Sequence, residues 1–255
     1  MFKIAKYIAL DIIKSKVILA YTILLAAICV SIFMADEDVT KGLVSITTVM
    51  LIIVPLVSVV YATTYYFNAS EFTELLVSQP ISRTNILMGK YLGISASILG
   101  AFLLGVGVPI LLFAFSFTGS TLILTGSLLT LCFVSLAFLS SVLMRDKAKG
   151  IGLALMMWFY CSIIFDGLVL VFLFAFSDYP LEKVLIAIVA FNPIDLARIL
   201  ILLQLDIAAL MGYTGALYQQ FFGSGWGVAF TLLMLMVWFL VPLWISLRVF
   251  KKKDL

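Results

Sequence analysis

Long apolar runs recur along the whole of this chain, and they leave few folds open to it. A helix needs about 20 mostly apolar residues to cross roughly 30 Å of hydrocarbon. Six segments meet that requirement: Val17–Met34, Leu43–Phe67, Leu92–Phe117, Thr121–Met144, Ile151–Phe176 and Trp226–Leu247. Since 64% of the 255 residues are hydrophobic, no stretch is polar enough for a separate soluble domain. The sequence predicts an all-α polytopic membrane protein with a single transmembrane domain over residues 1–255.

One further apolar run, Val184–Leu205, is also long enough to span a membrane. Its charged residues Asp195 and Arg198 would each cost roughly 2.5–3.5 kcal/mol near the centre of a spanning helix. A seventh span would also place the two ends of the chain on opposite sides, although both ends are basic. Because cytoplasmic segments carry an excess of Lys and Arg, we predict six spans with both termini in the cytoplasm.

The distribution of charge agrees with six spans. All but three of the 16 Lys and Arg residues lie in the segments that this topology places on the cytoplasmic side. The exceptions are Lys41, Lys183 and Arg198, and the outer segments are net acidic. We expect contacts with membrane lipids and none with nucleic acid.

Residues 1–16 form a two-faced pattern ahead of the first span. One stripe holds Ile4, Ala5, Ile8, Ala9, Ile12 and Ile13, and the other face holds Lys3, Lys6, Asp11 and Lys14. This pattern predicts a short amphipathic elbow helix in the inner membrane interface. A plain cytoplasmic extension of the first span is the alternative.

Residues 68–91 form a patterned polar segment between spans two and three. "FTELLVSQ" predicts a short helix with Phe72, Leu75 and Leu76 on one face and Glu71 and Glu74 on another. Pro80 ends this helix, and Ser82 caps a new one that continues into span three. An exposed helix with leucines and acids on different faces is suited to a groove on another protein. A solvated loop with incidental charges is the alternative.

The outer segment 177–225 predicts a small helical cap. Asn192 is placed to cap a helix that begins at Pro193, with Asp195 in its first turn and Arg198 on the same face. A second helix is expected over about 205–222. This cap is a candidate surface for an outer partner.

Several classes of chemistry are excluded or disfavoured by the residue content. The chain has no histidine, and each of its three cysteines lies in an apolar run, so zinc hydrolase sites and a disulfide framework are unsupported. Met157 and Cys161 lie one turn apart, but methionine commonly fills apolar interiors, and metal conduction is disfavoured. No phosphate-binding loop is present, because "MGK" is followed by Tyr91. Any ATP must be hydrolysed by another chain.

Two features inside the spans need an explanation. Asp166 lies in span five, where it would line a pathway, pair across a dimer, or stay protonated beside Tyr160 and Ser162. The small residues Gly93, Ser97, Ala101 and Gly105 recur every four positions along span three. Small residues at this spacing let helices approach closely, and we expect packing within the chain rather than a dimer seam.

The polar segment also resembles a known family. The pattern Glu74-Leu75-Leu76, Pro80, Ser82-Arg83, Gly89-Lys90 and Gly93 resembles the coupling-helix signature of ABC-2 type ABC transporter permeases. The six spans, the elbow helix and Asp166 in "IIFDGL" match the same family. "NPIDLARIL" followed by "MGYTGA" resembles the membrane subunits of nitrous-oxide reductase maturation transporters. The segment before Glu74 is shorter than in the family, which leaves the role of Glu71 open.

The resemblance implies a non-catalytic membrane subunit that pairs with itself and with a cytoplasmic ABC ATPase in the bacterial inner membrane. This chain would hold no cofactor, since ATP and magnesium would be bound by the ATPase. The implied ATPase-coupling residues are Glu71, Glu74, Leu75, Leu76, Pro80, Arg83 and Lys90.

On the outer side, the resemblance implies that Asn192, Asp195 and Arg198 contact a periplasmic β-helical partner. The system would export a substrate or transmit force for copper-site assembly in nitrous-oxide reductase. The alternatives are a permease of another ABC-2 exporter for drugs, lipids or peptides, and a stand-alone secondary transporter. A secondary transporter usually needs inverted repeats and several midplane polar groups. An intramembrane enzyme is disfavoured by the lack of histidine.

Overall fold

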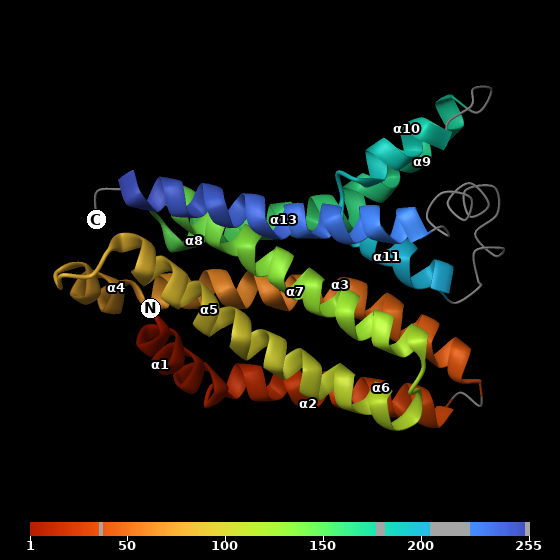
Figure 1. Cartoon of the computed structure of the whole chain (residues 1–255), viewed down its shortest axis with the longest axis horizontal. Coiled ribbons are helices and arrows are strands. Elements are labelled where there is room, and N and C mark those ends of the chain that lie inside the picture. Colours follow the sequence, from red (N-terminus) through yellow and green to blue (C-terminus); the bar gives the residue numbers. More distant parts are fainter. Residues whose placement is uncertain (36–37, 177–181, 205–224, 253–255) are drawn as a thin grey trace.

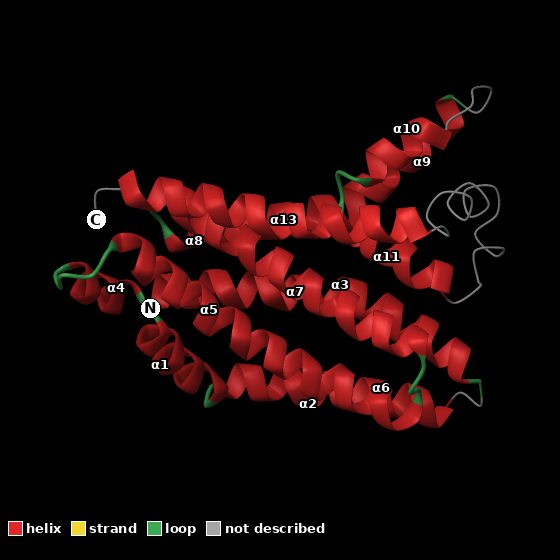
Figure 2. Ribbon diagram, viewed as in Figure 1, coloured by secondary structure: helices red, strands yellow, loops and turns green. Residues whose placement is uncertain are grey.

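The computed structural model describes the whole chain except residues 36–37, 177–181, 205–224 and 253–255 (Figure 1). Within the described part, every regular element is a helix (Figure 2). Six of the helical segments are long and apolar enough to cross a membrane: Lys16–Ala35, Val39–Asn68, Arg83–Phe113, Phe117–Leu143, Lys147–Ala175 and Gly227–Lys252. The prediction of an all-α protein with six spans is confirmed. Each predicted span lies within or close to an observed one.

Four of the spans are single helices. They are α2 (Lys16–Ala35), α3 (Val39–Asn68), α7 (Phe117–Leu143) and α13 (Gly225–Lys252). The third span joins α5 (Arg83–Phe102), the π-helix η1 (Leu103–Gly107) and α6 (Val108–Phe113). The fifth joins α8 (Lys147–Phe159), the π-helix η2 (Tyr160–Ile164) and α9 (Phe165–Ala175).

The apolar run at 184–205 forms two short helices, as the six-span prediction requires. They are α10 (Glu182–Val189) and α11 (Pro193–Gln204), which are separated by a turn that ends at Asn192. Pro193 stands at the first position of α11, where its missing N–H group leaves no hydrogen bond unmade. In Figure 1, α9 and α10 project away from the bundle, whereas α11 lies against it. The second helix expected over 205–222 lies outside the described residues.

α7 lies at the centre of the bundle and packs against α3, α5, α8, α11 and α13. In the most apolar 18-residue stretch of α7, 72% of the residues are buried. In the corresponding stretch of the fifth span only 11% are buried, so this span lies at the periphery of the bundle. Buried hydroxyls on α7 donate to a carbonyl three or four residues earlier, as Thr130 does to Gly126 at 2.9 Å. These hydroxyls of α7 are thus hydrogen-bonded within their own helix.

Small residues of the third span bring α1 and α2 close to it. A Cβ atom at Gly93 would lie 2.8 Å from the backbone oxygen of Ala5, and one at Gly105 would lie 2.8 Å from the Cβ of Leu25. The hydroxyl of Ser97 lies 3.4 Å from the carbonyl oxygen of Ala9. The expectation that these small residues pack within the chain is confirmed.

The predicted amphipathic helix is α1 (Phe2–Ile13). Ile4, Ile8 and Ile12 are buried, and α1 packs along α5. Ile13 of the same predicted stripe is not buried within the chain, since its side chain is 57% exposed. Positions 4, 8 and 12 drift slowly around the helix, and Ile13 falls a further 100° away, outside the contact with α5.

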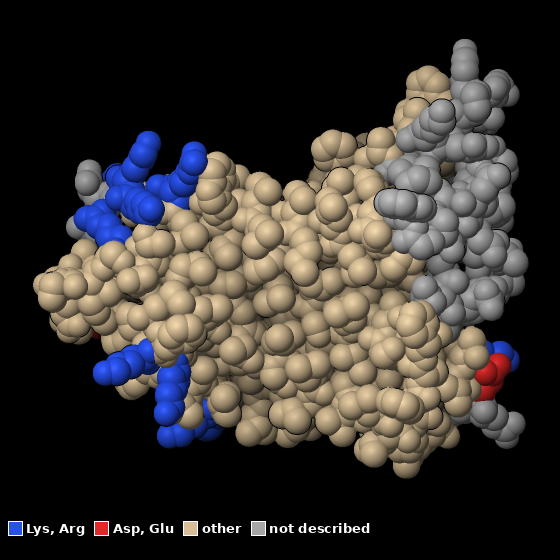
Figure 3. Space-filling model, viewed as in Figure 1, with Lys and Arg blue, Asp and Glu red and all other residues tan. Residues whose placement is uncertain are grey.

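The start of α1, the end of α13 at Lys252 and the segment between α3 and α5 lie at the same end of the bundle (Figure 1). Lys and Arg side chains gather at this end in the space-filling view (Figure 3). We call it the basic end and the other the distal end. The sidedness of the two ends in a membrane stays a prediction.

Candidate functional site

The predicted coupling helix is α4 (Ser70–Val77), at the basic end. It begins and ends two residues earlier than the expected "FTELLVSQ". Its end is set by Ser78, whose hydroxyl donates to the carbonyl oxygen of Leu75 at 2.8 Å and whose N–H donates to that of Glu74 at 3.1 Å. Pro80 follows in the exposed turn and is incompatible with a continuing helix.

α4 divides its side chains differently from the prediction. Glu71, Glu74 and Leu75 are exposed, and Leu75 is 65% accessible. Leu76, by contrast, is only 7% exposed and packs into the core of its own chain. Adjacent residues on a helix point about 100° apart, and here Leu75 faces outward while Leu76 faces the bundle. The predicted partner contact through Leu76 is therefore wrong, and Leu75 is the leucine available for docking.

Lys90 connects α4 to two spans. Its side chain lies in α5 and is 1% exposed. The ammonium donates to the hydroxyl of Thr73 in α4 at 2.7 Å and to the carbonyl oxygen of Tyr66 in α3 at 3.2 Å. It also lies 4.3 Å from the centre of the Tyr66 ring, a cation–π contact. Direct contact between Lys90 and a partner is ruled out by this burial.

The Lys90 contacts fix the position of α4. A buried ammonium is costly in free energy unless its N–H groups are hydrogen-bonded. Detachment of α4 would remove the Thr73 acceptor and leave an N–H group of Lys90 unpaired. Thr73 itself is held, because its hydroxyl donates to the carbonyl oxygen of Ala69 at 2.6 Å. α4 is thereby joined to α3 and α5 through polar contacts inside the protein.

The remaining residues of the predicted coupling set lie close by. Ser82 occupies the N-cap position of α5, as predicted, although its side chain makes no capping bond. Arg83 points toward the end of α13, with its Nη1 3.4 Å from the carbonyl oxygen of Lys251. Basic side chains near a helix C-terminus interact favourably with its unpaired carbonyl groups. Arg83 thus connects the start of α5 to the end of α13, the last span.

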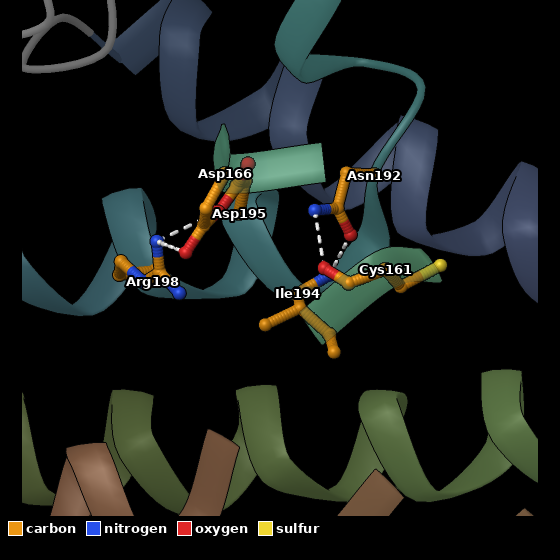
Figure 4. A network of polar contacts seen from close by, with 6 residues as sticks. All are labelled: Cys161, Asp166, Asn192, Ile194, Asp195 and Arg198. Atoms are coloured by element: carbon orange, nitrogen blue, oxygen red, sulfur yellow. Dashed lines mark hydrogen bonds and ion pairs between the residues drawn. The ribbon is translucent and has the colours of Figure 1, made fainter. Parts of the chain in front are cut away.

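A second polar cluster lies toward the distal end, where α11 meets the fifth span (Figure 4). Nη1 of Arg198 lies 3.0 Å from Oδ2 of Asp166 and 2.9 Å from Oδ1 of Asp195. The predicted proximity of Asp195 and Arg198 is confirmed. Asp166 pairs with Arg198 of α11 in its own chain, a contact that was not predicted from the sequence.

Asn192 joins the same two elements through its amide (Figure 4). Its Oδ1 accepts from the N–H of Ile194 at 3.0 Å, which is the predicted N-cap of α11. Its Nδ2 donates to the carbonyl oxygen of Cys161 at 2.8 Å, inside the π-helix η2. A π-helix interrupts the regular helical ladder, and the amide supplies a donor there.

The burial of this cluster changes the role of its residues. Asn192 and Asp195 are 0% and 7% exposed, so the predicted direct contact of these two residues with an outer partner is wrong. Arg198 keeps about a third of its side chain accessible. Burial raises the pKa of the Asp195 carboxyl to about 7, while the nearby Arg198 lowers it and Asp166 raises it. The cluster ties α11 to the kinked fifth span.

The described residues offer no cluster of three His, Cys, Asp or Glu side chains placed to hold a metal ion. Cys29, Cys132 and Cys161 are all buried and unpaired with one another, as the sequence indicated.

Polar contacts hold helices together at both ends of the described bundle. The contacts of α4 leave Glu71, Glu74 and Leu75 facing outward.

Comparison with known proteins assigns the family. Residues 50–255 match the ABC-2 family transporter protein domain. The chain belongs to this family. It is therefore a membrane permease of the ABC transporter type, and that resemblance is confirmed.

Two relatives refine the similarity of this permease. It is 28% identical over 238 residues to the "Probable ABC transporter permease protein NosY" of Pseudomonas aeruginosa. This alignment covers 83% of this chain and 85% of the relative. It is 24% identical over 277 residues to the protein of the same description from Stutzerimonas stutzeri, over 99% of this chain and 98% of the relative. An ABC transporter permease implies an ATPase partner.

Two contacts inside the permease were missed from the sequence. The burial of Lys90 could have been predicted from nearby residues, because it lies four residues from both Ile86 and Ile94 on the apolar face of α5. The Asp166–Arg198 pair has only a weak signal in the sequence, namely two opposite charges in otherwise apolar stretches. Both contacts join residues far apart in the chain.

Proposed function

We propose that this permease dimerises with itself and couples ATP hydrolysis by a separate cytoplasmic ATPase to export or force transmission across the bacterial inner membrane. The observation that carries the proposal is the arrangement of α4, which presents Glu71, Glu74 and Leu75 outward while Lys90 holds its other face. The clustering of Lys and Arg at the same end supports a cytoplasmic position for α4.

In this proposal α4 docks in a groove of the ATPase. The two exposed carboxylates would set the register against basic groups, and Leu75 would supply the apolar contact at the centre. ATP and magnesium stay on the ATPase. Closure of the ATPase would move α4, and the Lys90 contacts would pass this movement to α3 and α5.

At the distal end, the Asp166–Arg198–Asp195 and Asn192–Cys161 contacts would carry movement of the fifth span to α11. We propose a periplasmic β-helical partner on this side. Given the similarity to proteins described as NosY, the proposed process is copper-site assembly in nitrous-oxide reductase. Uptake of a labelled sulfur donor into inverted vesicles separates export of a substrate from transmission of force alone.

The docking of α4 is tested by reversing one exposed charge. Glu74→Lys should leave the protein folded in membranes, because Glu74 is exposed, and should reduce permease-stimulated ATPase activity by about tenfold or more. Lys41→Glu, a charge reversal at an exposed position in the first turn of α3 at the distal end, is the matched control and should keep full activity. Full stimulation of the ATPase by the Glu74→Lys variant refutes the docking.

A further inference from the structure

A groove of about 800 Å³ opens at the basic end, between the turn that joins α1 to α2 and the C-terminal part of α3. Its lining includes residues of α3 from Leu56 to Asn68. None of the lining residues takes part in the α4 contacts of Lys90 or in the cluster around Arg198. The proposed function therefore leaves this groove unexplained.

The lining of the groove changes from apolar to polar along α3. Leu56, Val57 and Val60 form an apolar wall, and each is half-buried in the protein. Asn68 ends the helix about 18 Å further along, at 1.5 Å per residue, and belongs to the polar mouth. Lys14 also lines the mouth and precedes the first spanning helix. A polar mouth beside an apolar wall matches the shape of a membrane amphiphile.

The mouth holds two opposite charges and two aromatic rings. Asp11 accepts a hydrogen bond from the hydroxyl of Tyr65 at 2.8 Å, and Lys14 lies one helical turn further on. The rings of Tyr61 and Tyr65 stack with their centres 6.3 Å apart. A carboxylate beside aromatic faces suits an ammonium group, and a lysine ammonium suits a phosphate. This pair of charges is complementary to a zwitterionic headgroup.

We propose that the groove binds a phospholipid with an ethanolamine headgroup. The lipid ammonium lies on Asp11, its phosphate lies on Lys14, and an acyl chain follows the wall formed by Leu56, Val57 and Val60. A primary ammonium donates hydrogen bonds to Asp11, whereas choline has no N–H to donate. A glycerol headgroup would bring its phosphate charge without an ammonium to meet Asp11. The bound lipid fastens the α1–α2 turn to α3.

Lipid competition on the full-length protein tests the proposal. The protein is exchanged into equal mixtures of phosphatidylethanolamine, phosphatidylcholine and phosphatidylglycerol, and retained lipid is measured by native mass spectrometry. The wild type should retain phosphatidylethanolamine about tenfold over the other two. Asp11→Asn should abolish this preference, and Lys14→Gln should lower retention of all three. Val60→Trp fills the apolar wall and should lower retention regardless of headgroup.

Lys3→Gln, on an exposed part of α1 that does not line the groove, should keep the wild-type preference. Equal retention of the three lipids by the wild type overturns the proposal, as does an unchanged preference in Asp11→Asn. Displacement of the lipid by soluble glycerophosphoethanolamine would identify a free headgroup compound as the ligand instead. A photoreactive benzoylphenylalanine in place of Val57 should form a lipid adduct. A cross-link to a second copy would show that the groove is a protein interface.

Discussion

Each end of the bundle uses a cation to hold a short helix, but the two cations have different partners. At the basic end Lys90, on a span, reaches neutral acceptors: the Thr73 hydroxyl, the Tyr66 carbonyl and the Tyr66 ring. At the distal end Arg198, on the short helix α11, lies between two carboxylates, Asp166 and Asp195. The first connection depends on burial and hydrogen-bond geometry, and the second depends on charge.

This difference determines how each connection fails. Removing Lys90 leaves neutral groups behind, so the loss comes from unmade hydrogen bonds and an empty space. Removing Arg198 takes away the cation that both Asp166 and Asp195 contact, so the loss comes from two broken ion pairs. In the proposed function the connection at the basic end would carry the movement of α4, whereas the one at the distal end responds to protonation.

The largest effect is expected for Lys90→Ala. The change removes two hydrogen bonds and a cation–π contact and leaves a cavity in a fully buried place. Unfolding free energy should fall by about 3 kcal/mol, measured by thermal or denaturant unfolding in detergent. The milder Lys90→Met fills the space, and it should fold yet lose permease-stimulated ATPase activity. Normal stimulation in Lys90→Met would show that the anchor plays no part in coupling.

Arg198→Met should have the next largest effect. It leaves Asp166 and Asp195 without their shared cation, and we expect a loss of about 2 kcal/mol, reduced from the value for a fully buried pair because Asp166 and Arg198 are about one-third exposed. Asp166→Asn is the matched comparison, since Arg198 keeps Asp195 as partner. It should cost less than about 1 kcal/mol. Equal losses in the two variants would contradict a charge-based connection.

The smallest effect is a dependence of stability on pH. Because the pKa of Asp195 is raised to about 7, the folded protein holds this proton over a range where the unfolded chain has released it. The resulting stability is fully present below the ordinary carboxyl pKa of 3.8 and is lost as pH rises through about 7. Thermal unfolding of the wild type should thus show a higher midpoint at pH about 5 than at pH about 8.

Asp195→Asn is the control for this pH dependence, because an amide does not titrate. The difference in midpoint between wild type and variant should change with pH and be on the order of a few degrees. A constant difference across this range would assign the pH dependence to other groups.

Features that depend on neighbouring residues could be predicted from the sequence. The six spans follow from run length, α1 follows from the spacing of Ile4, Ile8 and Ile12, and the Asn192 cap follows from Pro193 next to it. Contacts between distant elements could not. The residue pattern of α4 does not show that Lys90 hydrogen-bonds to Thr73. The buried face of α4 could therefore not be predicted. Leu76 was assigned to the wrong face for that reason.

The outer cluster shows the same limit. The pairing of Asp195 with Arg198 is local and was predicted, but the pairing of Arg198 with Asp166 depends on the path of the fifth span after η2. No residue pattern within the span fixes that path.

The central claim is that α4 lies on the cytoplasmic side and is moved by an ATPase in another chain. Leu75→Cys offers a direct test, because position 75 is 65% exposed while the three native cysteines are buried. A membrane-impermeant maleimide should label this variant in inside-out vesicles and not in right-side-out vesicles, and bound ATPase should block the reaction. Labelling from the outer face, or labelling that the ATPase leaves unchanged, would contradict the account.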